Sequence, residues 1–400
     1  MSGTTIQKAT KTGFYKEVQE AADELISKAK KYFDDGEKEF EANNFSNAAN
    51  NYKASTAFLP TMAGYLNEAV SLYNISDYQG AQQASRQGEL LARKKGDNVF
   101  EAAFLNISGI VFHDQGKVDI ALNYYQKALG INKAIGNNHD QVNALGIIGI
   151  VYHNQGKLND ALNYLQLALG IDKAIGNKLG QADDLNNIGI VYQDQGRLND
   201  ALYYYQQALG IDKAIGNRKG EADALGNIGT VYQDQGRLHN ALSYYQQALD
   251  IHKAIGNKKG EANALANMGT VYQIQGKLND ALNDLQQAVG IHKAIGNQPG
   301  QANALNNIGI VYQHQGRLDE ALNYHQQALG IDKAIGNQQE QANALNNIGI
   351  VYQHQGRLDE ALNCYQQALN LYIQIGAGRN VQQTKNDIEQ VRAAIKKIGI

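Results

Sequence analysis

The stretch Gln301–Asn323, QANALNNIGIVYQHQGRLDEALN, decides the fold, because it recurs without a change at Gln341–Asn363. Outward from this stretch, the chain repeats itself with a strict period of 40 residues. One glycine marks each unit: Gly109, Gly149, Gly189, Gly229, Gly269, Gly309 and Gly349. Self-similarity with a period of about 20 to 50 residues is typical of a solenoid or an array of stacked supersecondary units.

Each unit has the pattern of two amphipathic helices. In the unit that begins at Gln301, apolar residues recur at helical spacing along two segments. They are Ala304, Leu305, Ile308, Val311 and Tyr312 in the first segment, and Ala321, Leu322, Ala328, Leu329 and Ile335 in the second. We expect Gly316 to close the first helix in the left-handed conformation and Asp319 to be the N-cap of the second. Because neither helix can bury its stripe alone, successive units must stack.

Taken together, these residues resemble the motif of the tetratricopeptide repeat (TPR). The motif positions are Leu305, Ile308-Gly309, Tyr312, Gly316, Ala321, His325 and Ala328. The small Gly309 and Ala321 would let the two helices approach closely. The long unit is similar to the 40-residue class found in Pins/LGN polarity scaffolds and kinesin light chains. The resemblance implies an all-α fold, a right-handed superhelical α-solenoid of about nine tandem helix-turn-helix TPR units with terminal capping helices.

The ends of the chain depart from the regular unit, and four segments are expected. Residues 1–28 would form an N-terminal tail and an amphipathic capping helix with Phe14 and Val18 on its stripe. Residues 29–99 would form two divergent TPR units, and residues 100–376 seven near-identical units. Residues 377–400 would form a C-terminal capping helix, with an apolar stripe of Val381, Ile388, Val391, Ile395 and Ile398.

The composition argues against several classes of protein. The formal net charge is −3, whereas domains that bind nucleic-acid phosphates are usually strongly basic. No apolar run reaches the length of about 18 residues that a membrane helix needs. The single cysteine, Cys364, allows no internal disulfide. We therefore expect a cytoplasmic protein with no nucleic-acid or membrane partner.

The residues that could carry chemistry do not combine into a site. His314 and His354 share a slot in adjacent units, but no carboxylate or cysteine completes a metal-ligand set beside them. The glycines form no phosphate-binding motif. Acidic pairs such as Asp359-Glu360 recur at helix starts, where they complement the helix dipole. We expect no enzyme activity, no catalytic residue, no metal and no cofactor.

Five glycines fall inside the second helix of their units, where glycine costs about 1 kcal/mol relative to alanine. They are Gly130, Gly170, Gly210, Gly290 and Gly330. Two interpretations remain open: a close approach of the next repeat's backbone, or tolerance on an exposed face.

Polar residues of the first helix of each unit are the candidates for a binding site. In the TPR family, positions two before and two after the large apolar residue face the concave groove. The matching residues are Asn143, Asp183, Asn187, Asp223, Asn227, Asn263, Asn267, Asn303, Asn307, Asn343 and Asn347. A carboxamide both donates and accepts, so it can pair with a peptide backbone. In the resembled families such asparagines hold bound peptides. The alternative is that near-identical units merely copied a solvated asparagine.

The resemblance favours a protein–protein interaction scaffold that captures an extended or helical partner segment in an Asn-rich groove. Asp183, Asp194, Asp223 and Asp234 favour a partner segment with some basic character. One alternative is a peptide-sensing regulator of the Rap/PlcR type, although no helix-turn-helix output module is recognisable. The other is a structural solenoid that associates with itself, because its repeats present similar surfaces.

Overall fold

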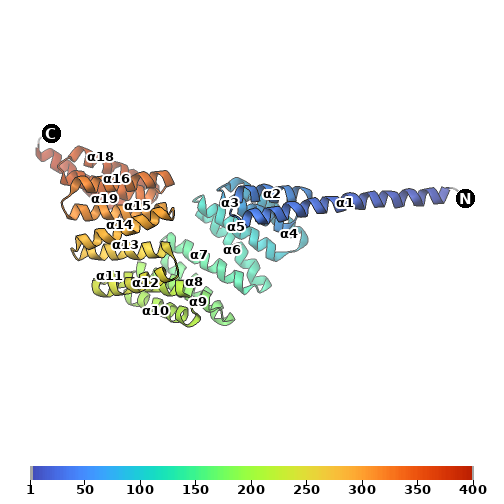
Figure 1. Ribbon diagram of the computed structural model, residues 1–400, viewed down its shortest axis with the longest axis horizontal. Helices are drawn as coiled ribbons and strands as arrows, with labels where there is room; N and C mark the ends of the chain where they lie inside the picture. The colour runs from blue at the N-terminus through green and yellow to red at the C-terminus, as the bar shows by residue number, and fades with distance from the viewer. Residues whose placement is uncertain (1–2, 399–400) are drawn as a thin grey trace. The chain divides into compact units, whose positions relative to one another are not determined.

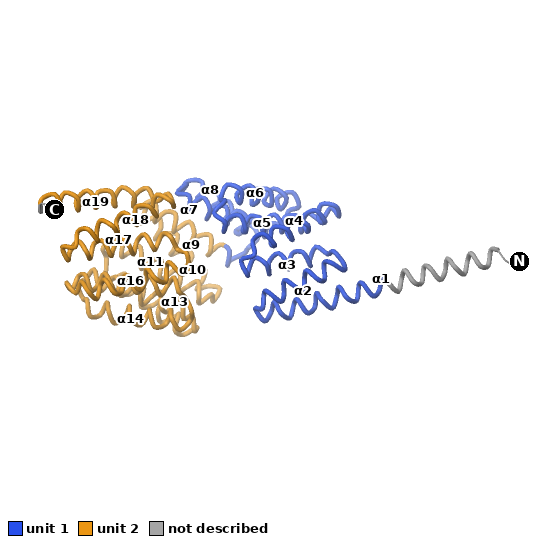
Figure 2. Tube along the Cα trace, turned by 90° about the horizontal axis from the view of Figure 1, so that it is seen from above, with its two compact units in different colours: residues 1–180 blue, residues 181–400 orange. Residues whose placement is uncertain are grey.

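The computed structural model describes the backbone of residues 3–398 and the side chains of residues 22–397, and in this part of the chain it contains helices and no strand. The chain divides into two compact units, Met1–Gly180 and Gln181–Ile400 (Figure 2). Among the helices of the described residues, none combines the length and apolar character that spanning a membrane would require.

Unit 1 is a series of antiparallel helix pairs. Its helices are α1 (Gly3–Glu41), α2 (Phe45–Phe58), α3 (Met62–Asn74), α4 (Tyr78–Lys95), α5 (Asn98–Asp114), α6 (Val118–Ile135), α7 (Asn138–Asn154) and α8 (Leu158–Ile175). Each helix packs on the next one along the chain between α1 and α8. The α1 helix runs without a break past residue 28, where we expected one segment to give way to the next. The expected stripe residues Phe14 and Val18 lie outside the described side chains.

Unit 2 continues the same pattern. Its helices are α9 (Lys178–Asp194), α10 (Leu198–Ile215), α11 (Arg218–Asp234), α12 (Leu238–Ala254), α13 (Lys258–Ile274), α14 (Leu278–Ala294), α15 (Gln298–His314), α16 (Leu318–Ile335), α17 (Gln338–His354), α18 (Leu358–Gln374) and α19 (Gly378–Ile398). From α13 to α16 the helices lie side by side (Figure 1). The α19 helix buries Ile388 and Val391 against α18, next to Tyr365 and Leu369. The side chain of Ile398 lies outside the described residues.

Nine helix pairs followed by α19 therefore make up the described chain, and the all-α repeat architecture is confirmed. Glycine in the left-handed region ends the helices as predicted, with φ of 72° at both Gly316 and Gly336. The prediction that Asp319 is an N-cap is wrong. The α16 helix begins one residue earlier, at Leu318, and no side chain in the described part of the chain caps it. Asp319 instead accepts a hydrogen bond of 2.8 Å from Gln355 Nε2 of the next repeat.

Two sets of glycines have opposite surroundings. A Cβ atom on Gly309 would lie 2.6 Å from Cε1 of His325, and one on Gly229 would lie 2.8 Å from the Tyr245 ring, so these glycines allow the close approach of paired helices that we expected. The helix-interior glycines are different. A Cβ atom on Gly130, Gly170, Gly210, Gly290 or Gly330 would meet open space. No neighbouring backbone approaches them, so exposure and tolerance explain their presence.

Candidate functional site

The predicted site residues all lie on the first helices of repeats and at the protein surface. Asn143 is on α7 of unit 1, and the remaining ten are on α9, α11, α13, α15 and α17 of unit 2. All eleven side chains are exposed or half-buried. Within unit 2, α11 contacts α13, α13 contacts α15, and α15 contacts α17. Neighbouring first helices, and the predicted residues that they carry, therefore lie next to one another.

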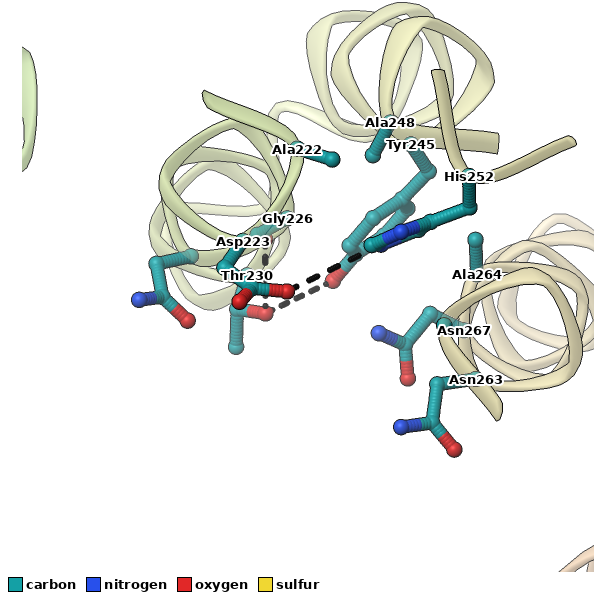
Figure 3. Close-up of a pocket in the computed structure, with 12 residues that line it drawn as sticks. Ala222, Asp223, Gly226, Thr230, Tyr245, Ala248, His252, Asn263, Ala264 and Asn267 are labelled. Carbon is teal, nitrogen blue, oxygen red and sulfur yellow. Dashed lines mark hydrogen bonds and ion pairs between the residues drawn. The ribbon is translucent and has the colours of Figure 1, made fainter. Parts of the chain in front are cut away.

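One pocket of about 240 Å³ lies between α11, α12 and α13 (Figure 3). The α11 side contributes Asp223 and Asn227, and the α13 side contributes Asn263 and Asn267. His252 of α12 points into the pocket between these two helices (Figure 3). Four residues predicted from the sequence therefore line one cavity.

A second pocket, of about 480 Å³, opens on the other side of α13. Its lining includes Asn263, Asn267, Asn303, Asn307 and His292. Because Asn263 and Asn267 line both pockets, the two cavities adjoin along α13. We call the two pockets together the Asn groove.

Other predicted residues do not line either pocket. They are Asn143, Asp183, Asn187, Asn343 and Asn347. Two of them are engaged within the protein. Asn347 Nδ2 donates to Asn306 Oδ1 at 3.2 Å, and Asn343 Oδ1 accepts from the hydroxyl of Tyr372 at 2.7 Å. The amides of α17 are therefore less available to a ligand than those of the Asn groove.

The histidines of the groove are buried and held in one orientation. His252 and His292 are only 4 % and 1 % exposed. Asn297 Nδ2 donates to Nδ1 of His292 at 3.0 Å, and the Oδ1 of the same asparagine accepts the amide of Gly300 at the start of α15. When neutral, His292 must then carry its proton on Nε2. Asn257 and Gly260 hold His252 in the same way.

The electrostatics of the pocket keep these rings neutral. Burial lowers the pKa of His252, and the nearby Asp223 only partly offsets this. Burial likewise lowers the pKa of His292, and Lys259 lowers it further. The Asp223 carboxylate lies 3.8 Å from Nε2 of His252, and partial burial raises the pKa of Asp223. Each pocket thus offers amide groups at its rim and a neutral imidazole N–H deeper inside.

The sequence prediction missed His252 and His292. Both occupy a position where Asp172, Asp212 and Asp332 stand in other repeats. The flanking Ile, Lys and Ala residues do not change among these repeats, whereas this position changes from Asp to His. This change could have indicated a functional position. Among the described residues, no group of three His, Cys, Asp or Glu side chains is arranged to hold a metal ion.

Comparison with known proteins identifies the repeat. The family model described as "Tetratricopeptide repeat" matches residues 100–174, 140–214, 220–294 and 300–374, more than half of the chain in total. A comparison with proteins of curated function finds no match.

Three solved structures illustrate the likeness in fold. Aspartyl phosphate phosphatase F from Bacillus subtilis is 13% identical with a TM-score of 0.61, covering 86% of this chain and 94% of that one. The apo form of the quorum sensor NprR from B. thuringiensis is 16% identical with a TM-score of 0.58, covering 86% and 98%. A Rap protein complexed with competence and sporulation factor is 13% identical with a TM-score of 0.52, covering 84% and 98%. At these identities the likeness shows the fold alone.

Proposed function

The chain belongs to the tetratricopeptide repeat family, and we propose that it is a non-catalytic binding protein that holds a segment of a partner protein in the Asn groove. One observation carries the proposal. Asn227, Asn267 and Asn307 follow one another on α11, α13 and α15, and line the adjoining pockets. Among the described residues, none of these three amides has a hydrogen-bond partner within the chain, so each can serve a ligand.

An extended segment suits this arrangement better than a compact ligand. Neighbouring packed helices are separated by about 8 to 10 Å, and an extended chain rises about 3.3 Å per residue. A bound extended segment would therefore pass one of these three asparagine amides about every three residues. Each amide can donate to a backbone carbonyl and accept from a backbone N–H. Such pairing does not depend on the ligand's side chains, so other features must select the partner.

A second candidate function is the sensing of a short free peptide. Structures with the same fold include a quorum sensor and a Rap protein complexed with competence and sporulation factor. The groove chemistry suits a free peptide as well as a protein segment, because both present the same backbone groups.

Pull-down with the full chain, followed by cross-linking and peptide mapping, tests the proposal. The expected result is a cross-linked segment attached to residues of α11, α13 or α15. Recovery of a protein segment favours the scaffold, and recovery of a free peptide favours the sensor. A segment mapped only to second helices, with no cross-link to these three, would contradict both.

A further inference from the structure

One buried polar position recurs in every regular repeat, close to the end of the second helix. It lies five residues before the first-helix N-cap and we call it the floor position. Its residues are Asn132 and Asp172 in unit 1, and Asp212, His252, His292, Asp332 and Tyr372 in unit 2. All are between 0% and 4% exposed. The surrounding repeat hardly varies, whereas this position changes among acceptor, donor and aromatic side chains.

Asp212 and Asp332 are floor residues that each have one buried carboxylate oxygen without a hydrogen-bond partner among the described residues, and Asp212 is the one of the two on which several other carboxylates act. The Oδ1 of Asp212 accepts from Asn217 Nδ2 at 2.8 Å, while its Oδ2 is buried and has no hydrogen-bond partner among the residues that the structure describes. A Cβ atom on Gly220 would lie 2.5 Å from Oδ1, so the Asp212 carboxylate packs directly against the backbone at the start of α11. A buried acceptor with no donor is destabilising, which makes Oδ2 a place where a ligand donor would be favoured.

The surroundings of Asp212 follow from the equivalent pocket around His252. His252 points between Asp223 of α11 and Asn263 of α13 (Figure 3). One repeat earlier, the corresponding flanking residues are Asp183 of α9 and Asp223 of α11. Burial raises the pKa of Asp212, and Asp183, Asp223 and Glu221 raise it further, against the hydrogen bond from Asn217. Asp183 on α9 and Asp223 and Glu221 on α11 therefore give the Asp212 carboxylate a negatively charged environment.

We propose that Asp212 determines specificity by seating a Lys or Arg side chain of the bound segment between α9 and α11. This inference rests on the proposed function, since it names the ligand chemistry of the same row of first helices. A cation would offset the repulsion that Asp183 and Asp223 exert on Asp212 and would give Asp212 Oδ2 a donor. A charge-assisted hydrogen bond is about twice as strong as a neutral one.

The next two floor positions select the opposite chemistry. His252 and His292 present neutral Nε2–H donors, which favour an uncharged acceptor such as an amide oxygen or a backbone carbonyl, because the Asp223 carboxylate already lies 3.8 Å from Nε2 of His252. A preferred segment therefore has a basic residue over Asp212 and acceptor groups about three and six residues away, given the extended-chain rise.

Charge-swap variants test this inference with substitutions that the array already tolerates. Asp212→His copies the residue found at positions 252 and 292, and His252→Asp copies the residue at 172, 212 and 332. Asp212→Asn copies position 132 and removes the charge while keeping the shape. Thermal melts of each variant check that the fold is kept.

The probes are three 12-residue peptides of Ala, Ser and Gly, with Arg, Glu or Gln at one central position. Binding to the full chain labelled with ¹⁵N-glycine is followed through the amides of Gly220 and Gly260, which lie against Asp212 and His252. We expect the Arg peptide to bind at least about tenfold tighter than the Gln peptide, with its largest shift at Gly220. Asp212→Asn and Asp212→His should abolish this preference. The double swap of Asp212→His with His252→Asp should move the largest shift to Gly260.

The outcomes separate this inference from the proposed function. If all three peptides bind the wild type alike, or if the Arg preference survives in Asp212→Asn, the groove binds peptides but Asp212 does not select them. If no peptide shifts either glycine amide, the role of Asp212 is contradicted, whereas the proposed function is decided separately by the cross-linking of the partner segment.

Discussion

Asn257 donates from Nδ2 to Nδ1 of His252 across 3.2 Å, while its Oδ1 accepts the backbone amide of Gly260. One side chain thus caps α13 and fixes the tautomer of a histidine in the neighbouring helix. The N-cap and the floor of the pocket are therefore parts of a single arrangement, which recurs with Asn297 and His292.

Asn257→Asp should invert the tautomer of His252 without uncapping the helix. Aspartate caps as well as asparagine does, as Asp97 does at the start of α5. Its carboxylate cannot donate, so Nδ1 of His252 should become the protonated nitrogen of the neutral ring, and the pKa of His252 should rise. Nitrogen-15 NMR of the imidazole measures both effects. His292, whose Asn297 is unchanged, is the internal control, and an unchanged His252 tautomer would contradict the assignment.

His325 should make stability depend on pH. It is fully buried in the slot that holds tyrosine in other repeats, and burial lowers its pKa to about 4. Because this lies below the ordinary value near 6.5, its contribution to stability is complete above about pH 6.5 and is lost as the pH falls toward 4. Between pH 7 and 4.5, the wild type should lose on the order of 2 kcal/mol more than His325→Tyr. Urea unfolding at both pH values measures this difference.

A tyrosine at position 325 would find a hydrogen-bond acceptor for its hydroxyl group. The hydroxyls of Tyr205, Tyr245 and Tyr365 lie 3.1, 3.0 and 2.9 Å from Gln193, Gln233 and Gln353. Gln313 is the equivalent acceptor for a tyrosine at 325. Equal losses of stability in the two proteins would show that His325 does not titrate on unfolding.

The helix-interior glycines should be stabilising sites for substitution. Changing Gly130, Gly170, Gly210, Gly290 and Gly330 to alanine places each Cβ in open space. Each change should raise the free energy of unfolding by about 0.5 to 1 kcal/mol, because alanine loses less backbone entropy. Gly229→Ala is the matched control and should destabilise, since its Cβ would lie 2.8 Å from the Tyr245 ring. Chemical denaturation measures the change in the free energy of unfolding for the five-site variant and for Gly229→Ala. A destabilised five-site variant would contradict the explanation that these glycines are tolerated because they are exposed.

The architecture was predictable because residues close together in the sequence determine each helix and its end, and the same residues recur in each repeat. Gly316 ends a helix through its own φ, and Gly309 faces the residue that the motif places opposite it. The caps were less predictable. Arg317 precedes α16 and pairs with Glu320, so the acidic first turn is used by a neighbouring cation and not as a cap.

The site was predictable only in part, because burial at the floor position depends on the next repeat. Asp212 and His252 look like ordinary polar residues of an amphipathic helix in the sequence. They become buried only because Gly220 and Gly260 let the next helix start against them. The engagement of Asn347 by Asn306, 41 residues away, similarly depends on packing between repeats.

Removal of α19 should expose apolar surface and cause association. Ile388 and Val391 cover Tyr365 and Leu369 of the last repeat, and truncation after Ala377 would leave that face bare. Light scattering of the truncated chain should show a larger species than the full chain. Deletion of Ala302 to Gln341, one complete repeat, is the control and should be better tolerated, since it rejoins equivalent neighbours. A monomeric truncation and an unfolded repeat deletion would contradict the modular account.

The central claim is that the asparagines of the first helices hold the backbone of a bound segment. Its most direct test is the calorimetric affinity of the mapped partner segment for the variant with Asn187, Asn227, Asn267 and Asn307 all changed to alanine. Asn343→Ala with Asn347→Ala is the matched control, because those amides already bond within the protein. Leu225→Ala, buried beneath the same surface, is the control for packing and should cost about 2 to 5 kcal/mol of stability.

The account predicts that the four-site variant loses on the order of 2 to 6 kcal/mol of binding, about 30-fold or more in affinity. Its melting temperature should hold or rise slightly, because alanine is the better helix former. The control pair should lose less affinity. An unchanged affinity in the four-site variant would contradict the account and would mean that the asparagines are only duplicated surface.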